Sequence, residues 1–189
     1  MKRKMTKLFL LVLAVSLSGC FFEPREDPTR FYILNSCDCP VQSVSYNGVI
    51  QIVNVEMPSF LNKLQITTLA EDGSVNISEF NRWAEPLSFL IGRTIAKDLS
   101  NALPKSTVFF DTLYIAPKSI QICVVISDCI GRPKGDFTIR GHWFIDGGKF
   151  HPFEKNVSVG SGYQSYAEAI SKCVCEVAKD MAKVISTKK

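Results

Sequence analysis

Apolar residues recur at spacings of three and four positions in two segments of the chain, residues 86–103 and 164–186. This spacing gathers them on one face of an amphipathic α-helix, so we predict a helix in each segment. Pro86 suits the first turn of the first helix, where its missing N–H costs nothing, and Pro104 ends that helix. The predicted core faces are Leu87, Leu90, Ile91, Ile95, Leu99, Ala102 and Leu103, and Tyr166, Ile170, Cys173, Val174, Val177, Met181 and Val184 or Ile185.

The opposite face of the first predicted helix is polar. It carries side chains that lie away from the apolar residues on the helical wheel, namely Ser88, Arg93, Lys97, Asp98 and Asn101. Because an amphipathic helix turns its polar face away from the core, we expect these side chains to face solvent.

The remaining segments of alternating or β-branched residues predict strands. Residues 64–69 and 74–83 form a predicted hairpin, because Glu71, Asp72 and Gly73 supply turn chemistry between two β-prone runs. The other predicted strands are separated by turns rich in proline and glycine, and they lie within residues 30–36, 48–58, 107–116, 119–130, 135–148 and 149–160. The last three of these indicate an antiparallel meander.

These elements predict an α+β fold with a mixed, mainly antiparallel sheet and two amphipathic helices packed on one side. Hydrophobic residues make up 46% of the chain, which is enough to build a core. We expect residues 31–189 to form a single domain, because a chain of about this length buries close to 70% of its unfolded surface.

The first twenty residues, MKRKMTKLFLLVLAVSLSGC, combine a positively charged start with a short apolar run. At about ten residues, the run Leu8–Leu17 has half the length of a helix that spans a bilayer core, so it indicates an export signal. The ending LSGC resembles the lipobox of bacterial lipoproteins, in which the cysteine receives a lipid. We interpret residues 1–19 as a lipoprotein signal peptide and residues 20–30 as lipidated Cys20 with a tether. The alternative is an ordinary secretory signal with an incidental cysteine.

The signal segment also accounts for the net positive charge of the chain. The full chain has 22 lysines and arginines against 18 aspartates and glutamates. Four of the basic residues lie in the signal segment, which leaves 18 of each sign, and these four are Lys2, Arg3, Lys4 and Lys7. A domain without net charge does not favour a nucleic-acid partner.

The cysteines that follow Cys20 are Cys37, Cys39, Cys123, Cys129, Cys173 and Cys175. An even number of cysteines in an oxidising compartment allows several disulfide pairings, and buried free thiols are the other outcome. Cysteines two positions apart seldom bridge each other, so we expect one cysteine of "CDC" to reach one of "CVC". On the predicted C-terminal helix Cys173 lies on the apolar face, so Cys175 is the better candidate to hold a peripheral strand or tether.

A metal site built from the two C-x-C pairs is the alternative interpretation of these cysteines. Structural zinc sites usually separate paired ligands by two to four residues, and a spacing of one residue in a strand and a helix fits that geometry poorly. We therefore predict no metal site.

The sequence contains no recognisable set of catalytic residues. His142 and His151 lie outside any nucleophile or metal motif, and "GSG" at residues 160–162 lacks the lysine and hydroxyl residue of a phosphate-binding loop. We predict that the protein is not an enzyme and that it has no cofactor apart from the covalent N-terminal lipid.

Several segments together resemble the ABC-type transport auxiliary lipoprotein family, the PqiC-like lipoproteins of Gram-negative envelopes. The resemblance rests on the lipobox, on "RFYIL" at residues 30–34, on "VNVEMPSFLNKLQITT" at 53–68 and on "NRWAEPL" at 81–87. The last block is the most specific, and we treat it as a family motif and a candidate interface made of Asn81, Arg82, Trp83, Ala84, Glu85, Pro86 and Leu87. The paired cysteines are not part of the family pattern.

The resemblance implies an accessory role in an MCE-type lipid transport system, in which an inner-membrane complex and a periplasmic MCE tunnel pass lipid between two membranes. The lipoprotein would lie at the periplasmic face of the outer membrane and dock an MCE-domain protein, and a homo-oligomer fits this role. Phe21 after Cys20 differs from the aspartate that retains many lipoproteins at the inner membrane. The alternative is a periplasmic lipoprotein that itself binds a lipid or small apolar ligand, suggested by 13 phenylalanines and 5 tyrosines.

Within the family motif, Trp83 lies where the predicted strand gives way to the helix. We expect its ring to cover the end of the sheet in preference to contacting a partner. We also expect Asn81, Arg82 and Glu85 to satisfy backbone groups near the helix N-terminus, where a glutamate suits the positive end of the helix dipole.

Overall fold

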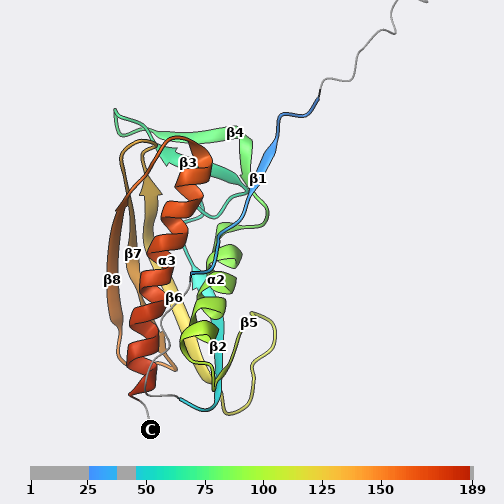
Figure 1. Cartoon of the computed structure of the whole chain (residues 1–189), viewed down its shortest axis with the longest axis vertical. Helices are drawn as coiled ribbons and strands as arrows, with labels where there is room; N and C mark the ends of the chain where they lie inside the picture. The colour runs from blue at the N-terminus through green and yellow to red at the C-terminus, as the bar shows by residue number, and fades with distance from the viewer. Residues whose placement is uncertain (1–25, 38–45, 188–189) are drawn as a thin grey trace, which may run out of the picture.

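The structure is a computed structural model that describes residues 26–37 and 46–187 (Figure 1). Two helices lie side by side on one face of a five-stranded sheet, and a three-stranded sheet lies at one end of the molecule. The α+β class and the mixed sheet are as predicted, although the strands form two sheets instead of one. The predicted signal peptide, Cys20 and Cys39 lie outside the described residues.

The five-stranded sheet combines parallel and antiparallel pairing. Its strand order is β5-β2-β6-β7-β8, in which β2 pairs in parallel with β5 and β6, whereas β6, β7 and β8 form the predicted antiparallel meander. Along β6, every second side chain from Ile122 to Ile126 is buried toward the helices, as period-two alternation requires. The strands are β2 (Val49–Glu56), β5 (Thr107–Phe110), β6 (Ile120–Gly131), β7 (Asp136–Ile145) and β8 (His151–Ser158).

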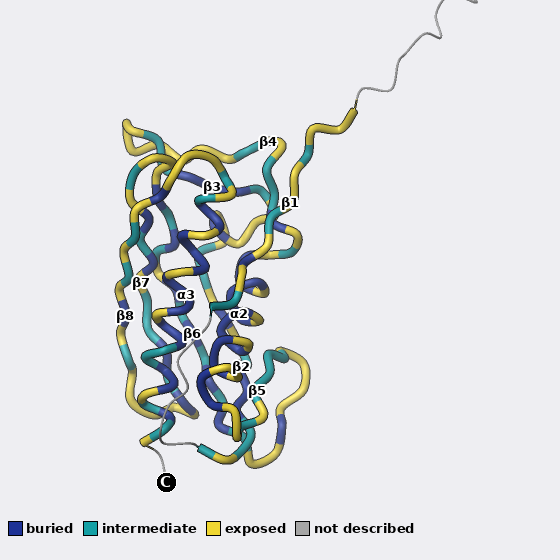
Figure 2. Tube along the Cα trace, in the orientation of Figure 1, coloured by how far each residue is buried: buried dark blue, intermediate teal, exposed yellow. Residues whose placement is uncertain are grey.

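The two helices are α2 (Leu87–Ala102) and α3 (Gly162–Ser186). Their predicted apolar faces are buried against each other and against the sheet, and Figure 2 shows this buried interior between the layers. Pro86 is the residue directly before α2, so it directs the chain into the helix without removing a helical hydrogen bond. Within the described part of the chain, no helix is long and apolar enough to cross a bilayer.

The three-stranded sheet contains the predicted hairpin. Its order is β1-β4-β3, with bounds β1 (Arg30–Tyr32), β3 (Gln65–Leu69) and β4 (Val75–Trp83). Between β3 and β4, Gly73 adopts a φ of 83°, which favours glycine, and the Asp72 side chain accepts a hydrogen bond from the Ser74 N–H at 2.9 Å. β1 pairs with β4 in parallel.

Tyr166 on α3 joins the two sheets. Its hydroxyl donates to the backbone oxygen of Thr67 in β3 at 3.1 Å and accepts a hydrogen bond from the N–H of Gly131 in β6 at 3.0 Å. The ring also packs edge-on against Phe137, with ring centroids 5.4 Å apart. A single buried side chain therefore fixes the three-stranded sheet against the main sheet.

Two sequence predictions about element boundaries and exposure are wrong. The strand expected over residues 107–116 ends at Phe110, because the following segment forms a loop around the Asp111 side chain. Ser88 and Asp98, expected on the solvent face of the first helix, are buried. The wheel alone could not show that the segment after β1 covers part of this face and supplies hydrogen bonds to Asp98.

Candidate functional site

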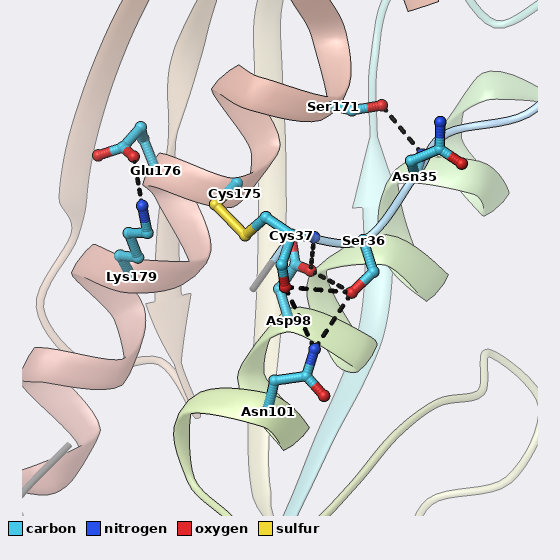
Figure 3. Close-up of a disulfide and its surroundings, with 9 residues drawn as sticks. All are labelled: Asn35, Ser36, Cys37, Asp98, Asn101, Ser171, Cys175, Glu176 and Lys179. Atoms are coloured by element: carbon cyan, nitrogen blue, oxygen red, sulfur yellow. Dashed lines mark hydrogen bonds and ion pairs between the residues drawn. A yellow bond between two sulfur atoms is a disulfide. The ribbon is translucent and has the colours of Figure 1, made fainter. Parts of the chain in front are cut away.

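A disulfide joins Cys37, in the segment after β1, to Cys175 on α3 (Figure 3). The bonded residues are 138 positions apart in sequence, and their Cα atoms are 5.9 Å apart. One cysteine from each C-x-C pair is used, which is the pairing between segments that the sequence favoured. Cys175 thus fixes the N-terminal segment across the helical layer.

Hydrogen bonds to Asp98 of α2 fix the same segment (Figure 3). The Asp98 Oδ1 atom accepts a hydrogen bond from the Ser36 hydroxyl at 2.7 Å and one from the Cys37 N–H at 2.9 Å. Asn101 donates to the Cys37 carbonyl at 3.2 Å, and the Asn35 N–H donates to the Ser171 hydroxyl of α3 at 3.0 Å. The segment is therefore held by both helices.

Asp98 is fully buried, and its Oδ2 atom has no hydrogen-bond partner among the described residues. Burial raises the pKa of the Asp98 carboxyl, because the loss of hydration disfavours the charged form more than the hydrogen bonds from Ser36 and Cys37 favour it. The burial of this acid was not expected from the sequence, because its position on the helical wheel placed it on the solvent side.

The ligand atoms of Cys37, Asp98 and Cys175 lie within 4.8 Å of one another. Both sulfur atoms are consumed by the disulfide, so neither can act as the thiolate ligand that a structural zinc site requires. Cys173 is buried on the core side of α3 and does not belong to the group of Cys37, Asp98 and Cys175. The donor set therefore suits a covalent cross-link and does not suit a metal.

Three further cysteines in the described part of the chain are free thiols, Cys123, Cys129 and Cys173. Desolvation raises the pKa of each, and it raises that of Cys173 to about 11. A thiol with a raised pKa stays protonated near neutral pH and is a poor nucleophile. These cysteines are packing residues of the core and of its sheet.

Trp83 of the family motif lies in the core. Its side chain is 1% exposed, and its backbone pairs with Tyr32 in β1 and donates to the Leu64 carbonyl at 2.6 Å. Leu87 is also buried. The two largest apolar residues of the motif therefore belong to the core, and the exposed surface of the motif is formed by its other members.

The polar members of the motif do not make the contacts that were predicted. Asn81 accepts a hydrogen bond from the Tyr32 hydroxyl at 2.9 Å, and Glu85 forms an ion pair with Arg93 at 3.0 Å. The N-terminal Ser88 N–H of α2 is satisfied by the Asn62 side chain at 3.1 Å. Asn62 comes from the preceding loop, so no local sequence signal indicated its role.

A groove of about 580 Å³ runs between α2 and β5. Its helical wall carries Phe89, Arg93 and Lys97, which follow one another at a spacing of four residues. Phe110 of β5 forms the floor, because its ring packs edge-on against Phe89 with centroids 5.5 Å apart. The ring also lies against the backbone of Gly92, where an added Cβ would be 2.6 Å from it.

The strand beside this groove has an open edge. The Thr107 N–H donates to the carbonyl of Gly48, directly before β2, at 3.0 Å, and the Asp111 N–H donates to the Ile52 carbonyl in β2 at 3.2 Å. Since N–H directions alternate along a strand, those of Val108 and Phe110 point away from β2. No strand of the described chain pairs with this outer edge of β5.

The loop after β5 closes one end of the groove and is tightly held. The Asp111 carboxylate accepts hydrogen bonds from the Leu113 and Tyr114 N–H groups at 2.8 Å and 3.0 Å. The buried Gln51 side chain bonds the carbonyls of Asp111 and Tyr114 and the N–H of Ala116. The loop nevertheless projects Leu113 into solvent with 96% of its surface exposed.

Comparison with known proteins identifies a family. The model of the ABC-type transport auxiliary lipoprotein component family matches residues 32–182. A crystal structure described only as an uncharacterized protein superimposes with a TM-score of 0.69 at 19% identity, and covers 83% of this chain and 98% of its own. The Xanthomonas campestris protein XCC0632, of family DUF330, gives 0.61 at 9% identity over 83% and 96%. No curated protein sequence matches the chain.

Proposed function

Because the chain belongs to the family of ABC-type transport auxiliary lipoprotein components, we propose that it is the lipid-anchored accessory component of an MCE-type envelope lipid transporter. Cys20 carries the lipid, and residues 21–30 tether a single domain, residues 31–189, to the periplasmic face of the outer membrane. The domain docks an MCE-domain protein, which links it to the inner-membrane part of the transporter. The anchor rests on the lipobox, and the transport role rests on the family.

The observation that carries the docking role is the open edge of β5 beside the α2 groove. An edge strand with unpaired backbone groups can accept an extended segment of another protein as an additional strand. Residues 107–110 are Thr-Val-Phe-Phe, so this edge lacks the charges and prolines that usually block such pairing. We assign the groove to an extended segment of the MCE-domain partner.

The walls of the groove define the side chains that such a segment would carry. The Phe89 and Phe110 rings offer an apolar floor for one of its residues. Lys97 forms no ion pair with any described residue, and Arg93 faces the same groove. An apolar residue followed by an acidic residue on the same side of the added strand fits this surface.

Co-purification of the transporter from solubilised envelopes tests the proposal. Val108→Pro removes one outward N–H from the open edge, and edge strands tolerate proline. We expect about tenfold less MCE-domain protein to be recovered with this variant, because one backbone hydrogen bond and the fit of the strand are lost. Val108→Ala is the matched control, since it shortens the same side chain and keeps the N–H.

Equal recovery of the MCE-domain protein with Val108→Pro and Val108→Ala would contradict docking at the β5 edge. Failure of the unmodified protein to recover any MCE-domain protein would contradict the transport role itself. Both variants should melt within a few degrees of the unmodified protein, because Val108 is only partly buried.

The alternative function, a carrier of lipid or another apolar ligand, predicts a bound molecule in the purified protein. The interior between the helices and the sheet, lined in part by Ile91, Ile126 and Val174, has no room for a water molecule, so a carried lipid would have to lie in a surface groove. We therefore expect native mass spectrometry of the purified protein to show no stoichiometric lipid apart from the anchor. A constant extra lipid mass that survives dilution would favour the carrier.

A further inference from the structure

Large apolar side chains are concentrated on the outer surface of the three-stranded sheet and its preceding loop. The residues with substantial exposure there are Phe31, Ile33, Phe60, Leu64, Val75, Ile77 and Phe80. We call this surface the apolar end. Exposed apolar side chains that gather on one surface mark a contact with a partner or a membrane.

The strand register explains why these side chains face outward. Tyr32 pairs with Trp83 on the side that faces the core, so Phe31 and Ile33, one position before and after, point to the opposite side. They are 64% and 59% exposed. Where β4 pairs with β3, Ile77 lies opposite Thr67, and its side chain is half exposed.

The chain leaves the fold at this same end. Residues 26–29 run outward from β1, and the tether to Cys20 starts there (Figure 1). Ten residues span at most about 33 Å when fully extended. The 25 residues of α3 make a helix about 37 Å long, which is longer than the extended tether. The far end of the molecule, where the β5 loop lies, therefore approaches the bilayer less readily than the end at which the chain leaves the fold.

Charged side chains of both signs lie around the apolar end. Lys63, Glu79 and Arg82 lie among its apolar residues in sequence, and Glu71 and Asp72 form the β3–β4 turn. Arg82 pairs in register with Phe31, so a cation lies beside an exposed aromatic ring. A cationic side chain next to an apolar one suits the headgroup boundary of a membrane that contains anionic lipid.

From these observations we propose that the apolar end rests on the bilayer that holds the lipid anchor and inserts Phe31 and Ile33 into the headgroup boundary. The proposal rests on the lipidation of Cys20. It orients the protein with the three-stranded sheet toward the membrane and the β5 edge toward the periplasm. A second copy of the chain or a protein partner on this surface is the competing outcome.

Fluorescence quenching by brominated lipids tests this orientation. The acylated protein is reconstituted into vesicles of phosphatidylethanolamine and phosphatidylglycerol with brominated acyl chains, as the Phe31→Trp variant and as the Leu113→Trp variant. Both positions are exposed, and the native tryptophans Trp83 and Trp143 are buried and give a common background. We expect at least twofold stronger quenching of the added tryptophan in Phe31→Trp than in Leu113→Trp.

Flotation of the same vesicles separates the two ways in which the experiment can fail. Protein that floats with the vesicles while both added tryptophans stay equally unquenched overturns the orientation and leaves the anchor intact. Stronger quenching at Leu113→Trp also overturns it. Protein that does not float at all contradicts lipid anchoring, and with it both the proposed function and this inference.

Discussion

Trp83 shows how a single residue of the family motif serves the fold. Its side chain is 1% exposed, and the residue ends β4 shortly before α2 begins. The sequence predicted this position from the strand-to-helix transition around Pro86. It could not show that Asn62, and not a residue of the motif, caps the helix, because that contact depends on how the preceding loop folds back.

Trp83→Ala should lower the free energy of unfolding by about 3–5 kcal/mol, because it leaves a cavity in a closely packed core. Urea unfolding followed by circular dichroism measures the change. Arg82→Ala is the matched control on the neighbouring residue, and we expect a loss of about 0.5 kcal/mol or less. A Trp83→Ala protein that unfolds normally and loses only its partner would show that the ring serves binding.

Asp98 predicts a pH-dependent contribution to stability. Burial raises the pKa of its carboxyl above the ordinary value of 3.8, so the folded protein binds this proton more tightly than the unfolded chain does. The associated stability is fully present below the ordinary pKa and is lost as pH rises through the folded-state pKa. Asp98→Asn removes this titration while its side-chain oxygen keeps the acceptor position for Ser36 and Cys37.

From about pH 4 upward, the unmodified protein should therefore lose free energy of unfolding relative to the Asp98→Asn variant. Denaturant unfolding across this range measures the difference in free energy of unfolding between the two proteins. The titrations that both proteins share cancel in this difference. A difference that does not change with pH would show that Asp98 has the same pKa in the folded and unfolded states.

At the scale of elements, the parts that follow from local periodicity were predictable. Both helices and the meander of β6, β7 and β8 bury a pattern that is visible in the sequence, and the hairpin around Gly73 was predicted by its turn residues. The division into two sheets was not predictable, because it depends on Tyr166 and on the parallel pairing of β1 with β4, both of which join segments distant in sequence. The groove and its open edge were not predictable either, because they depend on the placement of β5 beside β2, which is also distant in sequence.

Tyr166→Phe tests the link between the two sheets. It removes a hydroxyl that bonds Thr67 and Gly131, and it leaves their buried backbone groups without this partner. We expect the free energy of unfolding to fall by about 1–3 kcal/mol. Amide hydrogen exchange should accelerate first in β3 and β4, and uniform acceleration across the five-stranded sheet would argue against this role.

The disulfide should stabilise the fold by holding its first segment on the helices. Replacing Cys37 and Cys175 together by serine should lower the free energy of unfolding by about 2–5 kcal/mol, since the bond closes a long loop. Thermal unfolding under non-reducing conditions measures this loss. Cys123→Ser is a control that removes a free thiol, and a loss as large as that of the double variant would contradict a specific role for the bond.

At the scale of the whole molecule, the two ends have different chemistry. The end from which the chain leaves carries the three-stranded sheet and the exposed apolar residues, while the opposite end presents the β5 loop and Leu113 (Figure 1). The disulfide and the Asp98 contacts fix the first described segment along the helical layer between them. In the proposed orientation, the first end faces the membrane and the second faces the transport partner.

The attachment of lipid to Cys20 is the claim on which this orientation depends. Cells grown with radiolabelled palmitate should incorporate the label into the unmodified protein, and the Cys20→Ala variant should remain unlabelled at equal expression. The result that would contradict lipid anchoring is an unlabelled protein, or a variant that is labelled as strongly as the unmodified chain.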